Sequence, residues 1–215
     1  MKKITSIFLV ILIFIATFSI GYEVTYADSN CMAKGIYRSD IASGIGYAGP
    51  LLLSMYNNYS TSYSVDASET TFKNALRTSD VLFIQAHGNS GLIALKDSVI
   101  ITRVNIINYN VTSQTKLVYL SACKSGNTSS VQGDLCGALL SAGVSTVVAF
   151  TGTISGGSNS SGGIHMFNYN AAYYMASGNT ISQALAHALT DLGAATSSSC
   201  GADTYTIRGY SSLTL

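Results

Sequence analysis

The sequence predicts one α/β domain, a three-layer α/β/α sandwich around a mostly parallel sheet of about six strands. Three runs, 80–86, 116–122 and 144–150, are almost continuously apolar and read as buried strands. Segments with a helical spacing of apolar residues separate them. Apolar strands that alternate with helices are typical of a parallel sheet covered on both faces. The sequence contains no internal repeat and no linker long enough to divide the chain, so we expect a single domain.

The first half of the chain supplies further elements of this fold. Residues 32–37 form a weak strand pattern, and 62–65 a short strand. Helices are predicted over 50–56, with Pro50 near the start, and over 68–77, with Ser68 as N-cap. The cluster that follows residue 86 (HGNSG) is predicted to be a turn.

The second half follows the same alternation. Residues 92–95 and 98–101 are predicted to pair as a hairpin around Lys96 and Asp97. A helix is expected over 133–142, and a glycine- and serine-rich loop over 152–163. Two more helices are expected over 164–176 and 181–192, and short closing strands over 204–207 and 213–215.

The first 27 residues have the pattern of a bacterial-type signal peptide. Lys2 and Lys3 precede an apolar run over 7–18, and Thr25-Tyr26-Ala27 supplies the small residues of a cleavage site. The alternative is an uncleaved signal anchor, but a membrane-spanning helix needs about 20 apolar residues, more than this run contains. We therefore expect a secreted protein whose domain covers 28–215.

Composition restricts the partners of this mature chain. Without Lys2, Lys3 and Glu23 it has nine basic and nine acidic residues, so its net charge is zero with histidine neutral. A balanced charge does not predict binding to nucleic acid or, once the signal peptide is removed, to a membrane. No cluster of acidic side chains indicates a metal, and no motif predicts a cofactor.

Four cysteines remain after export, Cys31, Cys123, Cys136 and Cys200. An oxidising exterior permits disulfides, and four cysteines allow three pairings. Cys31 and Cys200 lie near the two ends of the chain, so a disulfide between them would join the termini. Cys136 lies within an apolar helical pattern and is predicted to be a buried thiol.

Two residues with chemically reactive side chains follow consecutive apolar strands. His87 comes directly after the run 80–86, and Cys123 directly after 116–122. Ligands of open α/β sheets bind beyond the carboxyl ends of the strands, so these side chains would face one cleft if the strands are adjacent. A histidine beside a cysteine is the minimum apparatus for thiol catalysis. The backbone N–H groups of Gly88 and Cys123 would then hold the oxyanion.

The alternative is that His87 is an ordinary loop residue and Cys123 a packing residue. The two blocks VLFIQAHG and LVYLSAC resemble those of the caspase-like clan of cysteine peptidases, which includes caspases, gingipains, clostripain and bacterial CHAT-domain proteases. Residues 133–150 and the helices from Met166 to Ala186 are similar to later parts of these domains. The closing 207–215 resembles the gingipain-like ending Gly-Asp-Pro-x-Leu, except that Tyr210 stands where Asp is usual.

This resemblance implies a caspase-like sheet and a catalytic mechanism. His87 would be the acid and base, Cys123 the nucleophile and Gly88 an oxyanion donor. The expected reaction is cleavage of a peptide bond through a thioester acyl-enzyme, with a protein or peptide as the partner.

The resemblance also points to substrate contacts. Clostripain-like enzymes have an Asp shortly before the Cys, which this chain lacks. The clan also places specificity groups after the first strand, where Asp40 lies, and an acid there would select Arg or Lys at P1. The alternative is that Asp40 caps backbone amides. Residues just beyond the next strand are expected to contact an extended substrate: Thr151, Gly152, Thr153 and Ser155.

The remaining candidates are predicted to be structural. His165 and His187 lie within helical patterns and are expected to have core or surface roles, and Asp134 is explained by its place near a helix start. Two other functions stay open. One is an inactive caspase-like binding or toxin/immunity module, which a disulfide between Cys123 and Cys136 would favour. The other is a transpeptidase. The sequence does not predict the oligomeric state.

Overall fold

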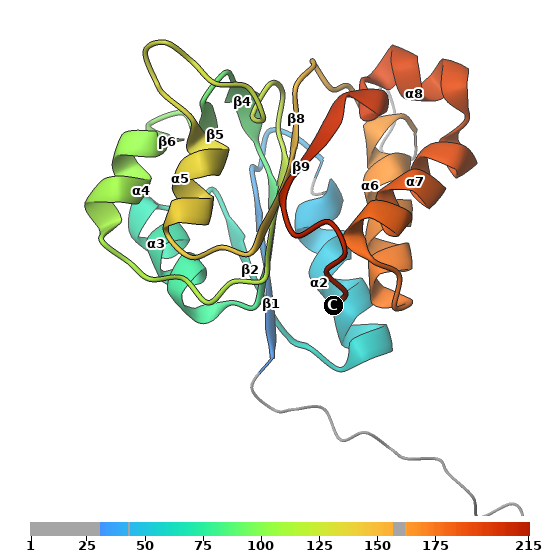
Figure 1. The fold of residues 1–215 in the computed structure, drawn as a ribbon, viewed down its shortest axis with the longest axis horizontal. Helices are drawn as coiled ribbons and strands as arrows, with labels where there is room; N and C mark the ends of the chain where they lie inside the picture. Colours follow the sequence, from blue (N-terminus) through green and yellow to red (C-terminus); the bar gives the residue numbers. More distant parts are fainter. Residues whose placement is uncertain (1–30, 43, 157–161) are drawn as a thin grey trace, which may run out of the picture.

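The computed structural model describes residues 31–42, 44–156 and 162–215; the predicted signal peptide and part of the predicted loop 152–163 lie outside these ranges. Its centre is a six-stranded sheet with the strand order β2-β1-β3-β7-β8-β9 (Figure 1). The strands are β1 (Met32–Tyr37), β2 (Ser60–Val65), β3 (Val81–Gln85), β7 (Leu117–Ser121), β8 (Thr146–Phe150) and β9 (Tyr205–Gly209).

The sheet is parallel except at one edge. β1, β2, β3, β7 and β8 pair in parallel, and β9 pairs antiparallel to β8. The three apolar runs of the sequence are β3, β7 and β8, and all their residues are buried because helices cover both faces. The predicted mostly parallel, six-stranded sheet is therefore confirmed.

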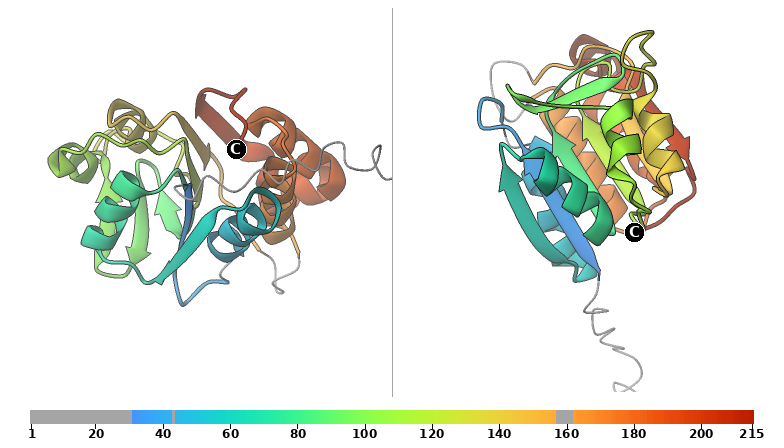
Figure 2. Two further views of the ribbon diagram at one scale, coloured as in Figure 1. Left: turned by 90° about the horizontal axis from the view of Figure 1, so that it is seen from below. Right: turned by 90° about the vertical axis from the view of Figure 1, so that its left-hand side faces the viewer.

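Helices form the outer two layers (Figures 1 and 2). One face of the sheet carries α3 (Glu69–Thr78), α4 (Arg103–Tyr109) and α5 (Leu135–Ser141). The other carries α2 (Gly44–Asn57), α6 (Ile164–Ala176) and α7 (Ile181–Leu192), with α8 (Ala194–Cys200) and the 3-10 turn η1 (Ala202–Thr204) beside them. Each face has its own apolar core cluster, which is what a three-layer sandwich requires.

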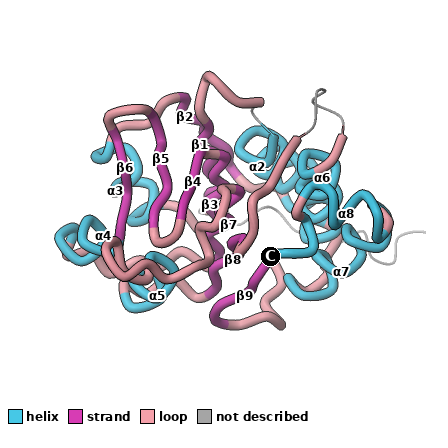
Figure 3. Tube along the Cα trace, turned by 90° about the horizontal axis from the view of Figure 1, so that it is seen from above, coloured by secondary structure: helices cyan, strands magenta, loops and turns pink. Residues whose placement is uncertain are grey.

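A second, smaller sheet continues from the end of β3. It consists of β4 (His87–Asn89), β5 (Leu92–Lys96) and β6 (Val99–Thr102), all antiparallel, and it lies over the side of α3, α4 and α5 (Figure 3). The predicted hairpin around Lys96 and Asp97 is confirmed as β5 and β6. The predicted turn after residue 86 begins instead as a strand, because β5 offers it a partner.

Two predicted elements differ in the structure. Residues 213–215 do not form a strand; the carbonyl of Leu213 accepts the N–H of Ile181, and the apolar side chains pack against the core. Helix α2 begins at Gly44, so Pro50 lies inside it. Glycines let this first part approach the sheet closely: a Cβ on Gly46 would stand 2.6 Å from the carbonyl oxygen of Ile36.

The four cysteines are free thiols, so the predicted disulfide between Cys31 and Cys200 is not formed. Cys31 directly precedes β1 at the amino end of this parallel strand. The carbonyl of Cys200 accepts the N–H of Ser155, beyond the carboxyl end of β8. The two cysteines therefore lie toward opposite ends of parallel strands, and a strand of five or six residues is about 17–20 Å long. A disulfide needs Cα atoms within about 7 Å.

Candidate active site

His87 and Cys123 meet at one edge of the sheet. β3 and β7 are adjacent and parallel, with Gln85 opposite Ser121 in the register. Each candidate lies two residues beyond these paired positions, and the N–H of Ala86 still donates to the carbonyl of Ser121 at 3.2 Å. The adjacency that the sequence argument required is therefore present.

Gly88 lies directly against the backbone of the cysteine. A Cβ on Gly88 would stand 2.6 Å from the carbonyl oxygen of Cys123, 3.1 Å from its nitrogen and 2.8 Å from the Cβ of Ala122. Only glycine fits such an approach without displacing one strand. Within the described part of the chain, the N–H of Cys123 has no hydrogen-bond partner. This geometry suits an oxyanion site, because the N–H remains open to an incoming carbonyl oxygen.

Cys123 lies on a tight turn at the end of β7. The next residue, Lys124, has a φ of 54°, an uncommon conformation for a side chain other than glycine, and its N–H donates to the carbonyl of Gly152 at 2.8 Å. The hydroxyl of Ser125 donates to the carbonyl of Ala122 at 2.8 Å. The turn is thus held from both ends, and it presents the partly exposed thiol beyond the sheet.

The thiol contacts the backbone of Ile154. Sγ of Cys123 donates to the carbonyl oxygen at 3.5 Å and accepts the N–H at 3.4 Å. In the described ranges no hydrogen bond joins Cys123 to His87. The two side chains share this edge of the sheet, and a substrate peptide bond would have to lie within reach of both.

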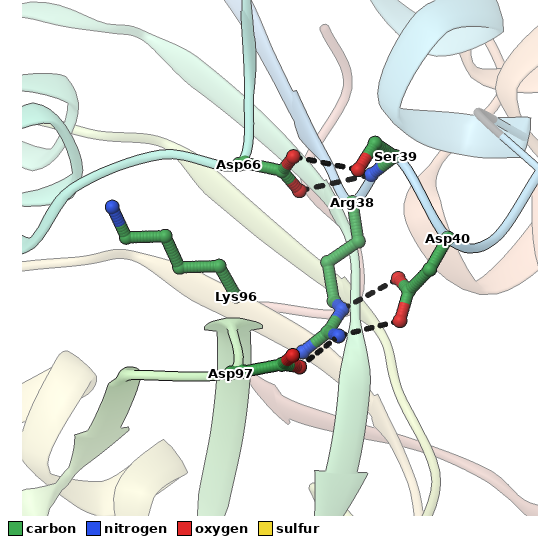
Figure 4. Close-up of a pocket in the computed structure, with 6 residues that line it drawn as sticks. All are labelled: Arg38, Ser39, Asp40, Asp66, Lys96 and Asp97. Carbon is green, nitrogen blue, oxygen red and sulfur yellow. Dashed lines mark hydrogen bonds and ion pairs between the residues drawn. The ribbon is translucent and has the colours of Figure 1, made fainter.

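His87 has a carboxylate partner. Its imidazole is half-exposed, and Nε2 lies 3.4 Å from Oδ2 of Asp40, which follows β1. The guanidinium of Arg38 donates two hydrogen bonds to the same carboxylate (Figure 4). The hydrogen bond from Arg38 lowers the pKa of Asp40 to about 2. Asp40 is therefore ionised at neutral pH and acts on the imidazole as an anion.

Arg38 binds both carboxylates of this charged group, a role that was not predicted from the sequence. Only 5% of the residue is exposed, and it also donates to Asp97, at the tip of the β5–β6 hairpin, at 2.7 Å. The carboxylate of Asp66 instead accepts hydrogen bonds from the N–H and the hydroxyl of Ser39 (Figure 4). These residues and Lys96 line a small surface pocket. Asp40 thus lies where a specificity group was expected, but its charge is already paired within the chain.

The segment after β8 is fixed against the rest of the fold. The N–H and hydroxyl of Thr151 both donate to the carbonyl of Thr204, and the N–H of Ser155 donates to that of Cys200. The carbonyl of Gly152 accepts the N–H of Lys124. Thr151, Gly152, Thr153 and Ser155 therefore lie in the segment that contacts the nucleophile, and several of their backbone groups already have partners. Their contact with a substrate stays a prediction. The direct contact is made by Ile154, which the prediction did not include.

Three other predictions concern structural residues. Asp134 is the N-cap of α5 and accepts the N–H of Gly137 at 2.9 Å, and Arg208 binds its carboxylate. Cys136 is fully buried, as predicted, and its burial raises the pKa of the thiol to about 12. His187 packs against the ring of Tyr174.

A cysteine and a histidine beyond adjacent parallel strands of a six-stranded α/β/α sandwich define a caspase-like domain. The family model of the CHAT domain matches residues 52–200. The chain belongs to the CHAT domain family, part of the caspase-like clan of cysteine peptidases, so the resemblance seen in the sequence is confirmed. No curated protein matches the chain. Among the described residues, no helix has the length and apolar character needed to cross a membrane.

Proposed function

We propose that this CHAT-domain protein is a secreted cysteine endopeptidase that uses Cys123 and His87. The observation that carries the proposal is the contact between Gly88 and Cys123 at the ends of adjacent strands. This contact supports the proposal because Cys123, the N–H of Gly88 and the imidazole of His87 then lie at one edge of the sheet. Peptide-bond cleavage requires these three groups together.

The mechanism follows from their positions. His87 takes the proton of the Cys123 thiol as the sulfur attacks the carbonyl carbon, and the N–H groups of Cys123 and Gly88 stabilise the oxyanion. The imidazolium of His87 gives its proton to the leaving amine as the C–N bond breaks, which leaves a thioester. His87 then accepts a proton from water while the water oxygen attacks the thioester, and the carboxylic acid and the thiol are released. Asp40 orients the imidazole through Nε2 and stabilises its protonated form.

Preference for Arg or Lys at P1, which Asp40 suggests, remains part of this proposal. Such a preference needs a carboxylate that the substrate can neutralise. Arg38 already supplies a positive charge to Asp40, so a basic substrate would have to share this carboxylate with Arg38. The preference therefore has to be measured by comparing substrates.

The test is covalent labelling with peptidyl chloromethyl ketones that carry Arg, Lys, Asn or Asp at P1. We expect at least one of them to alkylate Cys123, as peptide mass mapping of the protein would show. Cys123→Ala should abolish both labelling and cleavage, and Cys136→Ala, a matched change at the buried thiol, should retain them. Full peptidase activity of Cys123→Ala would overturn the proposal.

Product analysis separates hydrolysis from amine transfer. If the enzyme is a peptidase, added amines should not become joined to the new carboxyl end of the product. Peptide binding without turnover or labelling would instead indicate a non-enzymatic binding module. If the signal peptide is cleaved, the exported protein should begin at Asp28, as the mass of its N-terminal peptide would show. An exported protein that still begins at Met1 would contradict this cleavage.

A further inference from the structure

The strand β2 forms an open edge of the main sheet (Figure 2). Among the described residues it pairs only with β1, and none of its own residues is buried. The N–H of Ser60, at one end of β2, and that of Asp66, just past the other end, donate to carbonyls at the two ends of β1. Backbone groups alternate in direction along a strand, so the N–H and C=O groups of Thr61, Tyr63 and Val65 point away from β1. These outward groups have no backbone partner in the described part of the chain.

β2 lacks the features that usually protect an exposed strand edge. Its sequence is STSYSV, with no charged residue and no proline, and its register with β1 contains no bulge. Monomeric proteins usually block an open edge with one of these features or cover it with another segment. The opposite edge strand, β9, does contain a charged residue, Arg208. β2 is therefore the edge of this sheet that is suited to pair with a further strand.

Exposed side chains beside this edge can contribute to an interface. Side chains alternate between the two faces of a strand, so Thr61, Tyr63 and Val65 share the face that carries α2. The rings of Tyr63 and Tyr47, in α2, pack with their centroids 5.2 Å apart, yet Tyr47 is still 46% exposed and Val65 is 49% exposed. Leu51, one turn further along α2, is exposed as well. A stable interface needs such side chains in addition to backbone pairing, because it buries about 800 Å² on each partner.

The edge is complementary to itself. When two copies of β2 align antiparallel with Tyr63 opposite Tyr63, Thr61 of each copy stands opposite Val65 of the other. All the outward-facing residues then occupy hydrogen-bonded positions, where two opposed residues exchange both of their N–H···O=C bonds. The twofold axis brings the Tyr47–Tyr63 pairs of both copies together on one face of the joined sheet. Such an isologous contact closes at two copies.

Neither the net charge nor the candidate active site opposes this pairing. Without the predicted signal peptide the chain has a net charge of zero, so two copies do not repel each other. Cys123 follows β7, which is three strands away from β2, or about 14 Å at the spacing of adjacent strands. Antiparallel pairing also directs the carboxyl ends of the two sheets in opposite directions. The two candidate active sites would therefore open at opposite ends of the joined sheet.

We propose that a second copy of this chain binds at β2, with Tyr63 on the twofold axis, so that the two main sheets join into one. The observation that carries the proposal is the uncharged, unpaired strand edge that is symmetric about Tyr63. The proposal does not depend on the peptidase activity. It assigns a partner to the outward backbone groups of β2 and to the exposed Tyr47 and Val65.

Sedimentation velocity measures the assembly, with protein purified from cells that express the full chain. We expect the mass of two chains at about 100 μM protein, with dissociation on dilution. Val65→Lys introduces a charge at the paired edge and should raise the dissociation constant at least about tenfold. Val104→Lys, the same change at an exposed valine of α4, should leave the assembly unchanged. Circular dichroism should show the native fold for both variants, because both side chains are exposed.

Cysteine cross-linking tests the register of the pairing. Opposed hydrogen-bonded residues of antiparallel strands have Cα atoms about 5.5 Å apart, which is within reach of a disulfide. In a background with Cys31→Ala and Cys123→Ala, Tyr63→Cys should therefore form a disulfide between two chains when it is oxidised with diamide. Val65→Cys is the matched control. Its two copies would lie four residues apart along the paired strands, about 13 Å, and should not be linked.

A protein that remains a single chain at this concentration would overturn the proposal, whether or not it cleaves peptides. A dimer that is unaffected by Val65→Lys and is not linked through Tyr63→Cys would overturn it too, since the interface would then lie elsewhere. Assemblies larger than two chains would indicate an open, head-to-tail contact and contradict the twofold axis.

Discussion

Nε2 of His87 lies 3.4 Å from Oδ2 of Asp40, and Arg38 donates hydrogen bonds to both oxygens of the same carboxylate. The imidazole therefore has one nitrogen directed to a fixed anion, which leaves Nδ1 as the nitrogen available for proton transfer at the cysteine. The side chains of His87 and Asp40 are both about half-exposed, and exposed ion pairs contribute about 0–1 kcal/mol. The carboxylate is thus expected to position the histidine with a modest effect on rate.

Asp40→Asn tests this positioning role. We expect kcat to fall by up to about fivefold with little change in KM, because an exposed pair contributes at most about 1 kcal/mol. Asp66→Asn is the control, since Asp66 binds Ser39 and not His87. If Asp40 instead recognises a basic P1 residue, the loss will be confined to Arg and Lys peptides and will appear in KM.

The pH dependence of stability provides a separate test of the Arg38–Asp40 pair. The hydrogen bond from Arg38 lowers the pKa of Asp40 to about 2 in the folded protein, below its ordinary value of 3.8. A lowered carboxyl pKa stabilises the fold above pH 4, and this contribution is lost as the pH falls toward 2. The difference in Tm between the unmodified protein and Asp40→Asn should therefore be present at pH 5 and shrink as the pH falls from 4 to 2. A difference that grows from pH 4 to pH 2 would contradict the pairing.

Gly88→Ala tests the contact between β4 and the nucleophile. The added Cβ would stand 2.6 Å from the carbonyl oxygen of Cys123, so the two backbones must separate. We expect Tm to fall, at a cost of about 1–3 kcal/mol, and activity to be lost even where the protein is folded. Gly178→Ala is the control: nothing lies within 4 Å of its added Cβ, so only the strain of its positive φ is tested. Normal activity in folded Gly88→Ala would exclude Gly88 from the oxyanion site.

The scaffold of the site follows from local sequence signals. Continuous apolar runs predicted β3, β7 and β8 to within two residues at each end, because burial on both faces leaves few polar positions in a strand. The predicted helices over 164–176 and 181–192 match α6 and α7 at both ends. Ser68 is the N-cap of α3, as predicted, and accepts the N–H of Thr71. These elements place His87 and Cys123 without any knowledge of tertiary contacts.

The parts that were missed depend on partners distant in the sequence. His87–Asn89 contains no apolar periodicity and becomes a strand only because β5 pairs with it. Helix α4 is short and rich in β-branched and Asn residues, which have low helix propensity. Arg38 binds Asp97, 59 residues away, in addition to the nearby Asp40, and the backbone of Ile154 contacts Cys123 across 31 residues. No pattern within a single segment contains this information.

Thiol labelling separates the two cysteines of the active-site region. Burial raises the pKa of the Cys136 thiol to about 12, so this thiol stays protonated at pH 8. The thiol of Cys123 is partly exposed and free. Iodoacetamide at pH 8 should modify Cys123 and leave Cys136 unmodified until the protein unfolds, as peptide mass mapping would show. A disulfide-linked Cys123–Cys136 peptide would instead favour the non-enzymatic function.

The buried hydrogen bonds below the nucleophile form a chain from Tyr119 through Asn168 to Ser121, all fully buried. Tyr119→Phe removes one hydroxyl and leaves Oδ1 of Asn168 without a donor inside the core. We expect the free energy of unfolding to fall by about 1–3 kcal/mol, because an unpaired buried acceptor has lost its water. Tyr174→Phe removes a hydroxyl whose partner, Asp191, is exposed, and should cost under about 1 kcal/mol. Denaturant unfolding measures both changes. Equal costs would mean that water reaches Asn168.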